Sequence, residues 1–162
     1  MKNLLVLIVI AVGGYFVWQK FGGAGGPPKF DHPVYGEVRV TAEAQGREIE
    51  MALFIRSADD ADCHGRARKS WDGALAGCTG CKMHVEEKCH AELPARYAKL
   101  FDDVPIPSTY LSATAGTSGE RDGRMVVYGL TDAEGKMLCE QLRTELLKQY
   151  HGTAHCVAAS GG

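Results

Sequence analysis

Six cysteines constrain the fold of this chain more than any other feature of its sequence. They all lie between Cys63 and Cys156, in the last 100 of the 162 residues. An even number of cysteines in so short a stretch is typical of compartments in which disulfides persist, outside the cytosol. We therefore expect the cysteine-rich part to be an exported domain, periplasmic or extracellular, that is stabilised by three disulfides.

The distribution of charge argues against one class of partner, the nucleic acids. After Lys29 the chain has 15 basic residues against 20 acidic ones, so residues 30–162 carry a net charge of −5. Nonspecific binding to the phosphate backbone needs an excess of basic side chains instead. We expect no nucleic-acid partner.

An uncharged apolar run from Leu4 to Trp18 precedes the cysteine-rich part. Its 15 residues are short for a membrane span of about 20. A helix from Lys2 to Lys20, however, rises about 27 Å, and both lysines can reach the head groups. We expect residues 1–21 to be a single-pass membrane anchor that is retained. A cleaved signal segment is the alternative.

The rest of the chain divides into a linker and one domain. Six of the eight residues 22–29 are Gly or Pro, which predicts a flexible linker with a stiffer proline pair near its end. For residues 30–162 we predict an α+β fold, with a mainly antiparallel sheet of about five strands and with helices on one face.

Alternation and capping signals predict the first elements of this domain. Residues 37–42 and 48–55 alternate with period two on either side of Gln45-Gly46, which predicts an antiparallel hairpin. A capping box at residues 57–60 then predicts a helix. That helix should end at Gly77. Its stripe takes every fourth residue and consists of Cys63, Ala67, Trp71 and Leu75. A second short helix is expected over residues 82–91.

The second half of the domain predicts further helices and strands. Pro94 suits the first turn of a short helix, and the alternate prolines in residues 102–107 exclude regular structure there. Strands are expected over residues 110–115, 124–131 and 153–158. A capping box that starts at Thr131 predicts the longest helix, which we expect to continue to Gly152. Its apolar stripe is Leu138, Leu142, Leu146 and Tyr150.

Four clustered cysteines allow three pairings; they are Cys63, Cys78, Cys81 and Cys89. On the predicted helix Cys63 and Cys78 lie about 22 Å apart, whereas disulfide α-carbons are about 4.4–6.8 Å apart. Two pairings remain. We favour Cys63–Cys89 with Cys78–Cys81, because Cys63–Cys81 with Cys78–Cys89 needs a larger offset between the two helices.

The last two cysteines, Cys139 and Cys156, pair by a separate argument. From Cys139 to the end of its helix the chain rises about 16 Å, and an extended strand back to Cys156 descends about 13 Å. The two residues are nearly level if the strand packs antiparallel to the helix. We therefore predict a Cys139–Cys156 disulfide.

Two alternatives involve chemistry at the clustered cysteines. The Cys78-Thr79-Gly80-Cys81 spacing resembles the thioredoxin motif, which implies a thiol–disulfide oxidoreductase that uses Cys78 and Cys81. The residues before it predict a helix end, whereas that family has a buried strand there. A structural disulfide is therefore the simpler interpretation.

The second alternative is a zinc site in a domain that faces the cytosol. Its ligands would be Cys78, Cys81, His84 and Cys89. This set resembles a zinc knuckle, but it has two residues where that family has four between the second cysteine and the histidine. Thiolates and imidazole suit zinc, and the short spacer strains a tetrahedral site.

One continuous pattern extends from Met125 to Val157. It consists of a strand, the segment Gly129-Leu130-Thr131-Asp132, and a leucine-striped helix that leads to a second strand. This pattern is similar to half of a sporulation-related repeat domain, an envelope module that binds peptidoglycan. It covers about 33 residues and is shared with many ferredoxin-like halves. The resemblance implies the cell wall as a partner.

We predict a non-catalytic binding or assembly module, anchored in the membrane and without a cofactor. Its partner would be an envelope protein or the cell wall. Prolines present apolar side chains at a low ordering cost, so we place the contact on the proline loop. The contact residues would be Val104, Pro105, Ile106, Pro107 and Tyr110.

Overall fold

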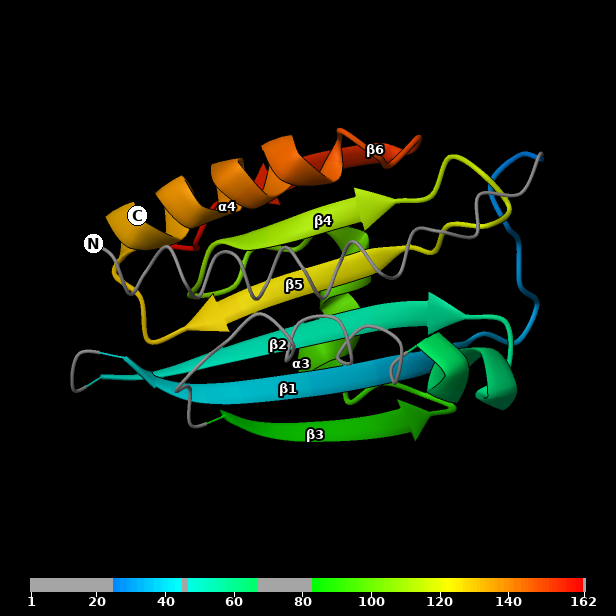
Figure 1. The fold of residues 1–162 in the computed structure, drawn as a ribbon, viewed down its shortest axis with the longest axis horizontal. Coiled ribbons are helices and arrows are strands. Elements are labelled where there is room, and N and C mark those ends of the chain that lie inside the picture. The colour runs from blue at the N-terminus through cyan, green and yellow to red at the C-terminus, as the bar shows by residue number, and fades with distance from the viewer. Residues whose placement is uncertain (1–24, 45–46, 67–82, 162) are drawn as a thin grey trace.

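A computed structural model describes residues 25–44, 47–66 and 83–161 of the chain. They form an α+β domain around a six-stranded antiparallel sheet in the order β3-β1-β2-β5-β4-β6 (Figure 1). The strands are β1 (Val34–Ala44), β2 (Arg47–Ser57), β3 (Met83–His90), β4 (Tyr110–Thr114), β5 (Gly123–Tyr128) and β6 (Thr153–Val157). The helices are α3 (Ala95–Ala98), the 3-10 helix η1 (Lys99–Asp102) and α4 (Asp132–Leu146), and residues 60–66 are also helical.

The hairpin of β1 and β2 confirms the prediction from alternation. The two strands pair from Val34 opposite Ser57 to Ala44 opposite Arg47. Because side chains alternate between the two faces of a sheet, Val38 and Leu53 share one face and lie together in the core. The Gln45-Gly46 turn lies outside the described residues.

Apolar side chains are buried on both faces of the sheet, so the prediction that helices pack on one face is wrong. On one face, Leu142 of α4 packs in a core with Leu53 and Met125. On the other face, α3 and η1 pack over Phe54, and α3 lies behind the sheet in Figure 1. The reason is that β2 carries apolar residues at successive positions, including Phe54, so both of its faces need cover.

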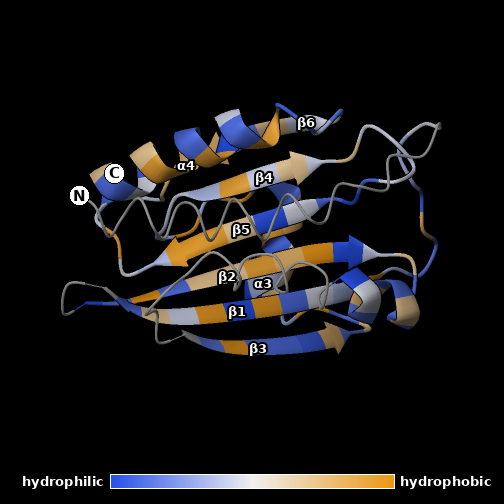
Figure 2. Cartoon of the chain, in the orientation of Figure 1, coloured by the Kyte–Doolittle hydropathy of each residue, from blue (hydrophilic) through white to orange (hydrophobic). Residues whose placement is uncertain are grey.

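The segment expected to form a second helix is instead the edge strand β3. It pairs with β1 from Tyr35 opposite His90 to Ala42 opposite Met83. Val85 and Cys89 stand four residues apart, which is helical spacing, but they also share one face of a strand. The strand is largely hydrophilic (Figure 2), and charged side chains on an edge strand discourage pairing with other chains.

The helix at residues 60–66 begins two residues later than predicted. The Asp62 backbone N–H donates to Asp59 Oδ1 at 2.8 Å, and the Ala58 N–H donates to Asp62 Oδ2 at 3.0 Å. Asp59 is therefore the capping residue. Ser57 is the fully buried last residue of β2. The rest of the predicted stripe, beyond Cys63, lies outside the described residues.

The second half of the domain follows the sequence closely. Thr131 and Glu134 form the predicted capping box of α4. The helix ends at Leu146, earlier than the expected end at Gly152, and Tyr150 is buried beyond that end. Strands β5 and β6 both run antiparallel to β4, which lies between them, so β5, α4 and β6 form a split β-α-β unit.

Candidate functional site

Two disulfides each join a helix to an edge strand of the sheet. Cys63, in residues 60–66, is bonded to Cys89 of β3, with 6.2 Å between the α-carbons. Cys139 of α4 is bonded to Cys156 of β6, with 6.0 Å between them. Both are pairs that the sequence favours, although the first joins a helix to a strand rather than two helices. These bonds indicate an oxidising, extracytoplasmic compartment.

The zinc set predicted as an alternative is not assembled in this state. Cys89 has no free thiolate because it is bonded to Cys63. His84 lies opposite Thr41 in the register, whereas Cys89 lies opposite Gly36, so the two side chains are on opposite faces of β3.

The structure does not describe the predicted redox pair or the predicted membrane anchor. Cys78 and Cys81 lie outside the described residues, as do residues 1–21. No helix in the described ranges is long and apolar enough to cross a membrane.

The proline loop between η1 and β4 is only partly a surface. Val104 is 42% exposed, and Pro105 and Pro107 are exposed. Ile106 and Tyr110, which we had expected at the contact, are instead buried in the core against α3 and η1. These two residues are therefore anchors of the loop and not part of its exposed face.

Hydrogen bonds hold the backbone of this loop at three points. The Tyr110 hydroxyl donates to the Val104 carbonyl at 3.0 Å, and the Val104 N–H donates to the Lys99 carbonyl at 3.2 Å. The Ser160 N–H donates to the Ile106 carbonyl at 2.7 Å. Burial raises the pKa of Tyr110 to about 12, and the nearby charge of Asp103 adds to the rise. The hydroxyl therefore stays a donor at physiological pH.

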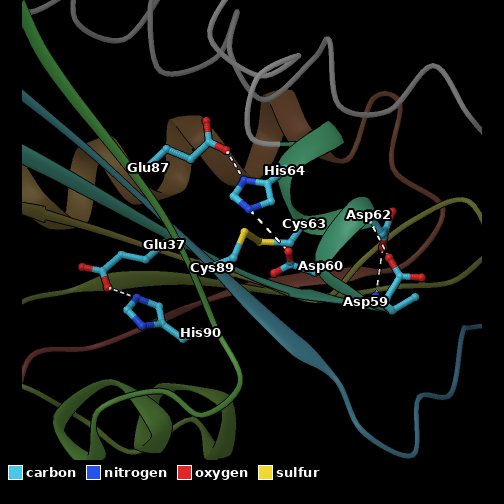
Figure 3. The surroundings of a disulfide bond; sticks show 10 residues. Glu37, Asp59, Asp60, Asp62, Cys63, His64, Glu87, Cys89 and His90 are labelled. Atoms are coloured by element: carbon cyan, nitrogen blue, oxygen red, sulfur yellow. Dashed lines mark hydrogen bonds and ion pairs between the residues drawn. A yellow bond between two sulfur atoms is a disulfide. The ribbon is translucent and has the colours of Figure 1, made fainter.

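A partly buried ion network lies on the same face of the sheet as α3, over β1, β2 and β3. Glu37 is 6% exposed, and its carboxylate accepts hydrogen bonds from Arg39 and from His90, whose Nε2 lies 2.8 Å away (Figure 3). Arg39 also bonds Glu50 and the hydroxyl of Tyr97, and its guanidinium lies over the Tyr97 ring. The network therefore links α3 to all three strands.

The charges in this network compensate one another. Burial raises the pKa of Glu37, but the hydrogen bonds and charges of Arg39 and His90 outweigh it and hold the pKa below its usual value. Glu37 is thus an anion, and Arg39 lies between two carboxylates. Because its groups already have partners, the network stabilises the packing of α3 against the three strands.

Sequence reasoning missed this network, although part of its signal was present. In the register of the hairpin, Arg39 stands diagonally across from Glu50 on the same face, which is an attractive cross-strand pair. His90 cannot be placed from the sequence, because the pattern predicts a helix over residues 82–91.

Comparisons with known proteins return no relative. No family model matches the chain, and no curated protein or solved structure is significantly similar to it. The function must therefore be argued from the residues of this chain.

Proposed function

We propose that this protein is a binding or assembly module of the cell envelope, anchored in the membrane by residues 1–21. Its contact with a partner protein is the exposed part of the proline loop, Val104, Pro105 and Pro107. The observation that supports this most strongly is that the loop exposes apolar side chains while its backbone is tied down.

A loop of this kind suits binding for an entropic reason. Association orders the groups at an interface, and each side chain that must be immobilised costs about 0.5–1.5 kcal/mol. Two prolines with fixed φ angles and three hydrogen bonds to the backbone of the loop leave little of it to be ordered on binding. The apolar character of the three exposed residues favours a protein partner over the polar glycan of the cell wall.

The compartment and the tether support the same proposal. Disulfides persist outside the cytosol, and the apolar run from Leu4 to Trp18 precedes a linker of Gly and Pro. A domain that is tethered in this way meets its partners within the envelope.

Photo-crosslinking in intact cells tests the proposed contact. A photoreactive amino acid replaces Val104 in the full chain, and a matched control replaces Met137 on α4. The two residues are 42% and 47% exposed. We expect a discrete crosslinked protein from position 104 and none from position 137.

Three results would contradict the proposal. One is the absence of any product at position 104, and another is the same product from both positions. The third is a product at position 104 that is digested by a cell-wall hydrolase, which would identify the cell wall as the partner.

A further inference from the structure

Asp60, His64 and Glu87 gather beside the Cys63–Cys89 disulfide, on the face of the sheet opposite to α3 (Figure 3). We propose that this cluster is a binding site for a divalent cation of the zinc class. The ligands are Nε2 of His64 and the carboxylate of Asp60, and Glu87 positions the imidazole. The site is independent of the proline loop.

The spacing of the two ligand atoms supports the proposal. His64 Nε2 and Asp60 Oδ2 are 3.6 Å apart, which is too far for a hydrogen bond. Zinc binds nitrogen and carboxylate oxygen at about 2.0–2.2 Å, so two ligands of a tetrahedral ion lie about 3.3–3.6 Å apart. The two atoms therefore have the separation of ligands that share one ion.

The second contact of His64 determines which ring nitrogen carries the proton in the neutral imidazole. Nδ1 lies 3.2 Å from Glu87 Oε1, a carboxylate oxygen that can only accept a hydrogen bond. In a neutral imidazole Nδ1 then carries the proton, and the lone pair of Nε2 faces the Asp60 carboxylate. A cation between these two acceptors removes their repulsion. A carboxylate behind a metal-bound histidine is the usual means of orienting such a ligand.

The backbone already holds the three residues in place. Asp60 and His64 are four residues apart on one helix and so lie on the same side of it. The disulfide joins Cys63, the neighbour of His64, to Cys89 on the strand that carries Glu87. The helix and the strand cannot separate while this bond is intact.

Ligand type and exposure indicate which ion and how it binds. Imidazole favours zinc, copper and nickel, whereas calcium and magnesium prefer oxygen ligands alone. The side chains of His64 and Asp60 are 59% and 76% exposed, so water or a side chain of a partner completes the coordination. The sulfur of Cys89 lies within 4.8 Å of a ring nitrogen of His64 and of a carboxylate oxygen of Asp60, but as part of a disulfide it is not a thiolate ligand.

Zinc titration of the full chain tests this site. The protein is purified in detergent without reductant and treated with iodoacetamide, and ZnCl₂ is titrated at pH 7.5 by calorimetry. We expect a saturable site that is lost in His64→Ala and in Asp60→Asn. Glu87→Gln should weaken binding about 10- to 100-fold, as loss of an outer carboxylate does in other metal sites. Acidification should also weaken binding, because protons compete for the imidazole.

His84→Ala is the matched control, because His84 is exposed and faces a carboxylate, Glu86, on the other face of β3. It should bind zinc like the unaltered chain. Disulfide mapping of each variant establishes that the fold is intact. Absence of saturable zinc binding, equal binding by the His64→Ala variant, or a preference for calcium or magnesium would each overturn the proposal.

Discussion

At the scale of single residues, Glu120 shows how one buried carboxylate can join distant backbone segments. It is 5% exposed, and it accepts hydrogen bonds from the backbone N–H groups of Gly116, Thr117 and His151. Burial raises the pKa of Glu120, but these hydrogen bonds, with one from the His151 ring, outweigh it and hold the pKa below its usual value. The loop before β5 and the turn before β6 therefore depend on a charged Glu120.

We expect Glu120→Ala to lower the free energy of unfolding by about 2–3 kcal/mol, because buried backbone donors lose a charged acceptor. The pH dependence has a definite sign. A carboxyl group with a lowered pKa stabilises the fold above its usual pKa, and this contribution is lost as the pH falls. Urea unfolding at pH 7 and pH 3 measures both effects. Glu120→Gln should lose less stability on acidification than the unaltered chain does.

Tyr110 allows a second test at this scale, of the loop rather than of the fold. Tyr110→Phe removes the hydrogen bond to Val104 and should cost about 1 kcal/mol. Tyr150→Phe is the control, because its hydroxyl donates to the Arg121 carbonyl in the core, away from the proline loop. Only Tyr110→Phe should speed amide hydrogen exchange at Val104. Equal exchange in the two variants would show that the hydroxyl does not fix the loop.

At the scale of elements, helix caps separate what the sequence predicts from what it cannot. Thr131 and Glu134 form the predicted capping box, because a single candidate box precedes a long, regularly striped helix. Ser57 does not cap the helix at residues 60–66, because the pairing of β2 with β1 extends through it, and Asp59 is the capping residue instead. A local motif cannot report where a strand stops pairing.

The two capping candidates predict losses of stability of different size. Asp59→Ala should lower the free energy of unfolding by about 1 kcal/mol, the usual cost of a lost cap. Ser57→Ala should cost less, because the buried Ser57 hydroxyl has no hydrogen-bond partner. Thermal unfolding of both variants measures the difference, and a larger loss in Ser57→Ala would show that Ser57 caps the helix.

Strand β3 shows where sequence periodicity fails to distinguish a strand from a helix. Both of its faces carry polar side chains, so alternation is weak, and the spacing of Val85 and Cys89 fits a helix equally well. Long-range pairing with β1 decides the outcome, and a local pattern does not contain that information. The hairpin and α4 were predictable because each of their patterns spans many residues and fits one period only.

The Cys139–Cys156 bond joins α4 to β6, and its removal tests how much this disulfide stabilises the packing of the two elements. Cys139→Ala or Cys156→Ala should lower the free energy of unfolding by about 2–4 kcal/mol, because the cysteines are 17 residues apart in the chain. The double variant should resemble either single one. Additive losses in denaturant titrations would mean that the two cysteines act separately.

At the scale of the whole molecule, the disulfides and the apolar N-terminal run make a prediction about location. In intact cells, a membrane-impermeant thiol reagent should fail to label Cys63, Cys89, Cys139 and Cys156 until a reductant is added. A reporter enzyme that needs disulfides should be active when fused after Gly162. Labelling of the four cysteines by a reagent confined to the cytosol would contradict export.

The placement of the two disulfides also sets how the domain responds to mechanical load. Each closes a loop at one outer strand of the sheet, across 26 residues at β3 and 17 residues at β6. At about 3.4 Å per extended residue, roughly 90 Å and 60 Å of chain cannot lengthen when the two ends are pulled. In the proposed arrangement, a domain stretched between a membrane and a partner therefore gains less length when it unfolds. It also refolds from a shorter tether when the tension is released.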